Sequence, residues 1–244
     1  MRHKNYSLQL DYLLIYYWDM NQQHRIWNYF CAYHNVYKAK VPLFATIGLK
    51  VQTKVIGSGK LKTILCRNPQ MEALIRVECS KLIKDWKEKT YNFDGLIYLM
   101  LLENEGNLIP LYIGKTDTMG KGDGNLSANI KNIENNTRNF ARWGDSYDYH
   151  IGDLSAVAVP GHGSKKVKLK YKDWAGCLFK KYPAANPKLK RQVYFWAKAW
   201  GPKETGPWVD YGPTSLNFLE YLLIGLASSA YGDKLLNRKG RNQA

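Results

Sequence analysis

The stretch from residue 95 to residue 115, GLIYLMLLENEGNLIPLYIGK, constrains the fold of this chain more than any other. Residues 96–102 and 108–113 are mostly apolar, and the polar residues between them include Gly106, which readily takes the positive φ of a tight turn. This pattern predicts a β-hairpin with one tyrosine on each strand and Lys115 after the second. Two phenols and an ammonium on one hairpin suit the binding of a phosphate and its attacking water better than the filling of a core.

The net charge of the chain indicates a polyanionic partner. Its 36 Lys and Arg residues outnumber its 20 Asp and Glu residues, which gives a formal net charge of +16. Nucleic acid favours such a surplus because each phosphate contact releases condensed counterions. An anionic membrane is the alternative, but the sequence contains neither a polybasic tail nor a lipidation motif.

The apolar runs and the cysteines indicate the compartment. No apolar run is long enough to span a bilayer, and no signal peptide opens the sequence. The four cysteines stand far apart, without the close pairs of a zinc site or the density of a disulfide framework. We therefore expect no membrane partner, a reducing environment and a cytoplasmic location.

The strongest charge cluster lies between residues 165 and 191, where ten cations accompany one acidic residue, Asp173. A solvated surface is one interpretation. Like charges repel one another unless a polyanion relieves them, so we interpret the cluster as part of an insertion, about residues 160–213, that follows a DNA backbone. The candidate phosphate contacts in this cluster are Lys165, Lys166, Lys168, Lys170, Lys172, Lys188, Lys190 and Arg191.

A helix start before the hairpin suggests two domains. Asn68 and Pro69 are typical of an N-cap and a first helical residue, and the apolar stripe that follows ends near Thr90. We expect residues 1–92 to form an N-terminal α/β accessory region, with a possible role in reading the target, and residues 93–244 to form the second domain.

Shorter patterns predict further elements from their periodicity. We expect a pair of strands within residues 41–67, a helix over residues 126–133, a buried strand over residues 154–159 and an aromatic strand over residues 193–200.

Four segments together resemble a known family. Leu96-Ile97-Tyr98 followed by Tyr112-Ile113-Gly114-Lys115 resembles the signature hairpin of the GIY-YIG endonucleases. Glu220 within SLNFLEYLLIGLA and Asn237 within KLLNRKGRN are similar to the metal-binding glutamate and the closing asparagine of that family. The resemblance implies an α+β fold, in which helices flank a small mixed or antiparallel sheet.

The resemblance also implies a chemistry: metal-dependent hydrolysis of phosphodiester bonds in duplex DNA by a restriction or defence nuclease. Tyr98 would be the general base, Lys115 would lower its pKa and orient the water, and Tyr112 would bind a phosphate oxygen. Glu220 would hold one Mg²⁺ (or Mn²⁺) per active site. The alternative for Glu220 is a capping box with Asn217 as N-cap. Cutting both strands would require a homodimer or successive nicks.

One departure from the family pattern leaves alternatives open. Asn129 and Ile133 stand where many relatives carry a phosphate-binding arginine and a histidine four residues later. Arg142 is the candidate replacement and Arg138 the second, although Arg142 could instead pack on an aromatic ring. His150 could contact a phosphate or serve as a structural strand residue. An RNA-directed nuclease and a non-catalytic DNA-binding protein on a decayed nuclease fold therefore remain alternative functions.

Overall fold

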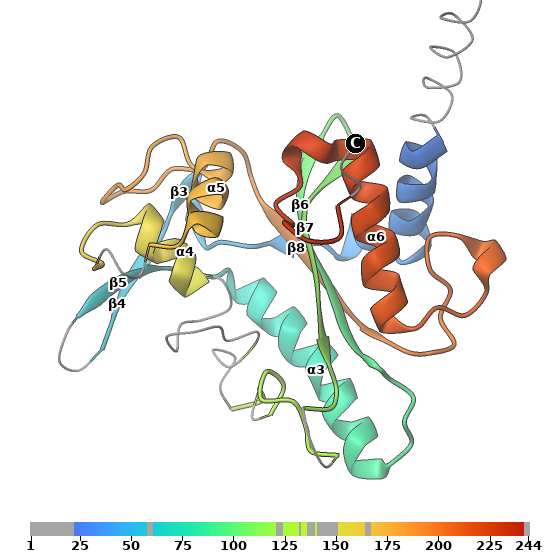
Figure 1. Ribbon diagram of the computed structural model, residues 1–244. Helices are drawn as coiled ribbons and strands as arrows, with labels where there is room; N and C mark the ends of the chain where they lie inside the picture. Colours follow the sequence, from blue (N-terminus) through green and yellow to red (C-terminus); the bar gives the residue numbers. More distant parts are fainter. Residues whose placement is uncertain are drawn as a thin grey trace, which may run out of the picture.

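The structure is a computed structural model of the 244-residue chain. It describes residues 22–57, 61–120, 124–131, 133–135, 140, 151–163 and 167–241 (Figure 1). The fold is α+β: a four-stranded antiparallel sheet lies between helices on both of its faces.

The predicted hairpin is confirmed and lies within this sheet. Strands β6 (Gly95–Asn104) and β7 (Asn107–Asp117) are joined by a turn in which Glu105 and Gly106 both have positive φ. Strand β8 (Tyr194–Trp200), which confirms the predicted aromatic strand, pairs with the other edge of β6. The short β1 (Val41–Pro42) completes the order β1-β8-β6-β7.

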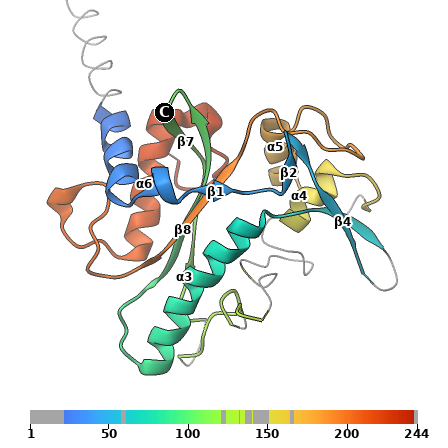
Figure 2. The same ribbon diagram turned by 180° about the vertical axis from the view of Figure 1, so that it is seen from behind.

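Side chains alternate between two cores across the sheet, because successive residues of a strand point to opposite faces. Leu96, Tyr98 and Met100 belong to a core that includes helices α3 (Pro69–Glu88), α4 (Ile151–Ala158) and α5 (Leu169–Leu178). Ile97 and Leu99 belong to the opposite core, with α6 (Leu216–Tyr231) and the helix over residues 22–33. Figures 1 and 2 show these helices on either side of the central strands. The central strand β6 is therefore buried over most of its length.

Helix α3 begins and ends as its sequence predicts. The Asn68 side chain accepts a hydrogen bond from the Gln70 N–H, and Pro69 occupies the first turn. The helix ends before Lys89, which takes the left-handed conformation common at helix C-termini.

The described residues before position 92 share the sheet and both cores with the rest of the chain. Strand β1 pairs with β8, and the buried Trp27 donates an indole hydrogen bond to the Leu108 carbonyl of the hairpin. The Phe44 and Met71 side chains lie in the same core as Tyr98. The sequence boundary at residue 92 therefore coincides with no break in either core.

Two predicted elements are wrong. Residues 154–159, expected to form a strand, lie largely in helix α4, where Ser155 donates a hydrogen bond to the Ile151 carbonyl and accepts one from the Leu65 N–H. A short apolar run is equally compatible with a buried helix. The described residues of 126–133 form a β-bridge at Leu126 and turns after it instead of a helix. The Asn129 N–H donates to the Ser127 hydroxyl, and the Asn129 amide donates to Thr116; such local side-chain bonds compete with a helix.

The remaining elements are short. The predicted strand pair within residues 41–67 is confirmed by β4 (Thr53–Ile56) and β5 (Lys62–Leu65). None of the helices in the described ranges is both long and apolar enough to cross a membrane. The other elements are α2 (Val36–Ala39), β2 (Thr46–Ile47), β3 (Lys50–Val51), η3 (Val209–Tyr211) and η4 (Gly232–Lys234).

Candidate active site

The two hairpin tyrosines lie side by side on one face of the sheet. Tyr98 faces Gly114 across the strand pair, and its ring centroid lies 6.4 Å from that of Tyr112. A Cβ at position 114 would come within 2.5 Å of the Tyr98 ring and hydroxyl, so glycine is what allows the phenol to lie across β7. Phe140 and Phe195 pack on the Tyr98 ring and leave it only 1 % exposed.

Tyr112 remains a protonated phenol at neutral pH. Burial, with a smaller effect from the nearby Glu220 carboxylate, raises its pKa to about 12. Its ring packs against Trp174 of α5, with 4.9 Å between centroids. The Tyr112 hydroxyl is therefore suited to donating a hydrogen bond and unsuited to accepting a proton.

A lysine of the basic cluster lies next to Tyr112. The Lys170 ammonium is 4.8 Å from the centroid of the Tyr112 ring, 5.2 Å from that of Trp174 and 5.5 Å from that of Tyr171. Burial and the positive charge of Arg238 lower the pKa of Lys170 to about 8. The sequence assigned Lys170 to a general DNA-contacting surface, whereas its position is beside the tyrosine pair.

Glu220 extends from α6, which packs on the sheet face opposite to that of Tyr98 and Tyr112, and it interacts with Lys115 of β7. Burial raises the pKa of its carboxyl above the usual value; the Lys115 ammonium and a backbone hydrogen bond from Lys115 oppose this effect, and Asp117 adds to it. The N-cap of α6 is Ser215, whose side chain accepts a hydrogen bond from the Phe218 N–H. Glu220 is therefore beyond the third helical position, and the capping-box interpretation with Asn217 as N-cap is wrong.

Asp117 belongs to this group although the sequence did not single it out. Its carboxylate oxygens lie 2.7 and 2.9 Å from the Lys115 ammonium. Residues two apart on a strand share a face, so the spacing of Lys115 and Asp117 in the sequence could have predicted that their side chains lie together.

Asn237 holds the outer edge of β7 beside the tyrosines. Its Oδ1 accepts from the Ile113 N–H at 2.9 Å, and its Nδ2 donates to the Ile113 carbonyl at 2.8 Å. The neighbouring Leu236 N–H bonds to the Leu111 carbonyl. The side-chain amide thus pairs with the edge residue between Tyr112 and Gly114 as a neighbouring strand would.

Most of the other candidate cations lie away from the tyrosine pair and from Glu220. Arg191 donates to Asn104 at the turn end of the hairpin, and Lys168 pairs with Asp153 at 3.5 Å. Lys172 lines a cavity beside α4. Lys188 forms a β-bridge with Lys50, and the Lys190 ammonium donates to the Gly176 carbonyl. The candidates Arg138, Arg142, His150, Lys165 and Lys166 lie outside the described residues.

Glu220 and Asp117 are the residues of this site that could hold a divalent cation. Glu220 and Asp117 offer hard oxygen ligands, and the raised pKa of Glu220 reflects an environment that a positive charge would relieve. Within the described ranges, no three His, Cys, Asp or Glu side chains cluster closely enough to form a metal site by themselves. Water and substrate oxygens commonly complete the coordination of Mg²⁺ held by one or two carboxylates.

Comparisons with protein-family models, with curated proteins and with solved structures found no match to this chain. The functional interpretation therefore depends on the chemistry of the residues around the hairpin: a phenol pair, a half-buried lysine, and two carboxylates joined by a second lysine.

Proposed function

We propose that this chain is a metal-dependent endonuclease of the GIY-YIG type that hydrolyses phosphodiester bonds in duplex DNA, as restriction or defence nucleases do. The observation that supports it is that Glu220, from a helix distant in sequence, accepts a backbone hydrogen bond from Lys115 of β7 and acts electrostatically on Tyr112 on the other face of the same strand. The basic composition of the chain supports a nucleic-acid substrate.

The residues around the hairpin have complementary roles in this proposal. Tyr112, with its pKa of about 12, donates a hydrogen bond to a non-bridging phosphate oxygen. Lys170 supplies the positive charge that the family pattern places at the position of Asn129. Glu220 and Asp117 would hold one Mg²⁺ (or Mn²⁺), which would neutralise charge on the scissile phosphate and its leaving oxygen.

Tyr98 is the proposed general base, but its surroundings set a condition on this role. At 1 % exposure, its hydroxyl acts on a water molecule only if substrate binding moves the side chains that enclose it. If they do not move, Tyr98 supports the Tyr112 ring, and a Tyr98→Phe variant keeps its activity. Loss of cleavage with retained binding in Tyr98→Phe would support the base.

The direct test is a digest of mixed-sequence duplex DNA with Mg²⁺ or Mn²⁺, followed by mapping of the cut ends. Glu220→Gln should lose cleavage and keep binding, whereas Glu88→Gln, an exposed carboxylate on α3, should cleave normally. Cleavage by Glu220→Gln would refute the assignment.

Two outcomes would favour the alternatives. Cleavage of matched RNA in preference to DNA would indicate an RNA-directed nuclease. Metal-independent binding without cleavage of any duplex would favour a non-catalytic DNA-binding protein, which the burial of Tyr98 and the presence of Asn129 make the stronger alternative.

A further inference from the structure

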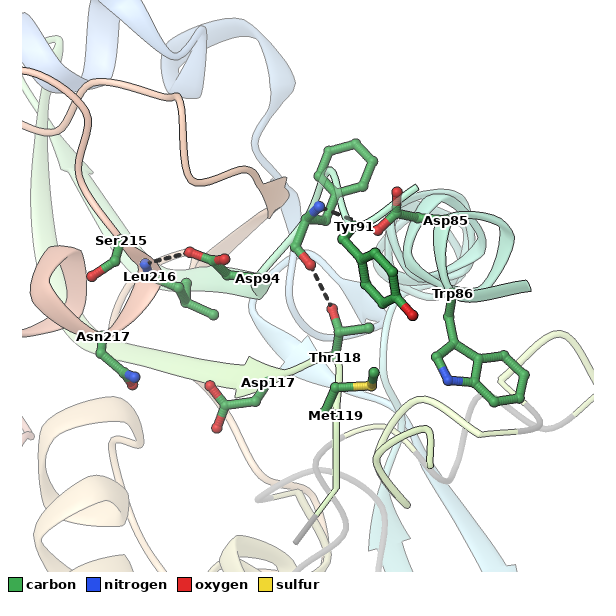
Figure 3. A pocket seen from close by; sticks show the side chains of 11 residues that line it. Asp85, Trp86, Tyr91, Asp94, Asp117, Thr118, Met119, Ser215, Leu216 and Asn217 are labelled. Atoms are coloured by element: carbon green, nitrogen blue, oxygen red, sulfur yellow. Dashed lines mark hydrogen bonds between the residues drawn. The ribbon is translucent and has the colours of Figure 1, made fainter. Parts of the chain in front are cut away.

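A cavity of about 400 Å³ opens at the end of the hairpin where β6 begins and β7 ends (Figure 3). Its walls come from the C-terminal end of α3, the following loop, residues 117–119 and the first residues of α6. This volume lies within the ~300–1,000 Å³ of typical small-ligand sites.

One wall of the cavity is aromatic and apolar. Tyr91 is 63 % exposed and Met119 is 37 % exposed, and both line the opening with Trp86. Trp86 is held in place by a hydrogen bond of 2.9 Å from its indole nitrogen to the Gly124 carbonyl. Aromatic rings such as those of Tyr91 and Trp86 can stack on a nucleobase of any identity.

Two carboxylates of the cavity lining hold backbone N–H groups. Asp85 accepts hydrogen bonds from the N–H groups of Asn92 and Phe93. Asp94 accepts from the Leu216 N–H at the start of α6. The bonds from Phe93 to Asp85 and from Leu216 to Asp94 appear in Figure 3, and they make these carboxylates part of the framework of the cavity.

The charge of the lining residues determines which chemical class of ligand the cavity can bind. None of the described residues that line the cavity is Lys or Arg, and three of them are aspartates. A phosphate would be repelled there, whereas the edge of a neutral base can donate to Asp117 and exchange hydrogen bonds with the Asn217 amide.

The cavity adjoins the proposed phosphate site. Asp117 lines the cavity and also bonds to Lys115, and it contributes to the raised pKa of Glu220. Asn217 precedes Glu220 by three residues, which is about one helical turn. A base held in the cavity would therefore leave its attached phosphate near Glu220.

We propose that this cavity binds one unstacked nucleobase of the nucleic-acid substrate, next to the phosphate that is cleaved. The base stacks on Tyr91 and its edge meets Asp117 and Asn217. The inference rests on the proposed function, and it narrows the substrate class to duplexes in which one nucleotide is unpaired or readily extruded.

The test compares the binding of the full-length protein to two DNA duplexes by fluorescence anisotropy. One duplex carries a single unpaired nucleotide, and the other carries an abasic residue at the same position, so that their phosphates match. We expect the unpaired base to improve binding by about tenfold, in line with the stacking of one base on an aromatic ring. Equal affinities would overturn the proposal.

Substitutions locate the effect in the cavity. Tyr91→Ala should remove most of the difference between the two duplexes, and Met119→Ala should reduce it; both side chains are exposed, so the fold should tolerate their loss. Tyr211→Ala, an equally exposed tyrosine (59 %) outside the cavity, should leave the difference unchanged. Weaker binding of both duplexes to the same extent in Tyr91→Ala would refute base binding at this place.

The two proposals fail in distinguishable ways. Discrimination between the duplexes without cleavage by the wild-type protein would refute the nuclease and keep the base site. Cleavage that is lost in Glu220→Gln, without discrimination between the duplexes, would keep the nuclease and refute the base site.

Discussion

The role inferred for Lys170 changes once its neighbours in the structure are known. In the sequence it is one of ten cations in a basic cluster, whereas in the structure three aromatic rings surround its ammonium. Partial removal from water makes the charged form less favourable, and it also strengthens any contact with a phosphate.

We expect Lys170→Met to weaken DNA binding and cleavage by roughly tenfold to a hundredfold, the loss expected for one charge-assisted contact. Lys172→Met, two residues along the same helix, is the matched control and should bind nearly normally. Equal effects of the two substitutions, measured by anisotropy, would place Lys170 among general surface charges.

The same residue predicts a pH dependence. Because the pKa of Lys170 is about 8, instead of the usual 10.5, its ammonium is lost as the pH rises through 8. DNA binding should therefore weaken above that pH at constant ionic strength. Lys170→Arg should abolish this weakening, since a guanidinium stays protonated.

Substitution of Asn237 should lower the free energy of unfolding, an effect that can be measured separately from cleavage. Asn237→Ala leaves the buried N–H and carbonyl of Ile113 without their present partners, which should cost about 1–3 kcal/mol in urea unfolding. Asn107→Ala, at the exposed hairpin turn, should cost much less. Similar costs for both would mean that water replaces the Asn237 amide.

The elements that the sequence predicts well are those with local signals. The hairpin turn, the Asn68 cap of α3 and the aromatic strand β8 are specified by residues within a few positions of one another. Helix α4 was missed because an apolar run of six residues fits either period, and the partners that decide it, β5 and α5, are distant in sequence.

The candidate-site residues also divide into those that a local sequence pattern identifies and those that depend on distant contacts. The tyrosine pair, Glu220 and Asn237 were found through a motif, since their residue types and order are visible in the sequence. Asp117 and the position of Lys170 depend on strand register and on how α5 packs, so no local pattern contains them.

Where α3 ends, one carboxylate organises the loop that leads into β6. Asp85 is buried, which acts to raise its pKa, but hydrogen bonds from Thr90, Asn92 and Phe93 outweigh burial and hold the pKa below its usual 3.8. Since the folded-state pKa is the lower one, the carboxylate stabilises the fold above about pH 3.8. This contribution is lost as the pH falls through the folded-state value.

Asp85→Asn should therefore cost about 1–3 kcal/mol of unfolding free energy at neutral pH, because the loop N–H groups lose a charged acceptor. The difference from wild type should shrink as the pH is lowered below 3.8. Asp210→Asn, at an exposed position, is the control, and urea unfolding at both pH values measures the effect.

At the scale of the molecule, the described residues before the hairpin pack against it and stabilise it. Trp27 is fully buried against the sheet and bonds to Leu108, so Trp27→Ala should cost about 3–5 kcal/mol. Tyr29→Ala on the exposed side of the same helix should be nearly neutral. A small effect of Trp27→Ala on thermal unfolding would instead indicate an independently folded N-terminal region.

The outer edge of β7, and the part of β8 that the two-residue strand β1 leaves uncovered, both have their backbone partly engaged within the chain. The segment at Asn237 covers β7 beside the tyrosines, and Glu78 accepts the Ala199 N–H of β8. At these positions a second copy finds no open main-chain groups to which it could add a strand. If two copies combine to cut both strands of a duplex, they must meet through other surfaces, and their separation would then set the stagger between the two breaks.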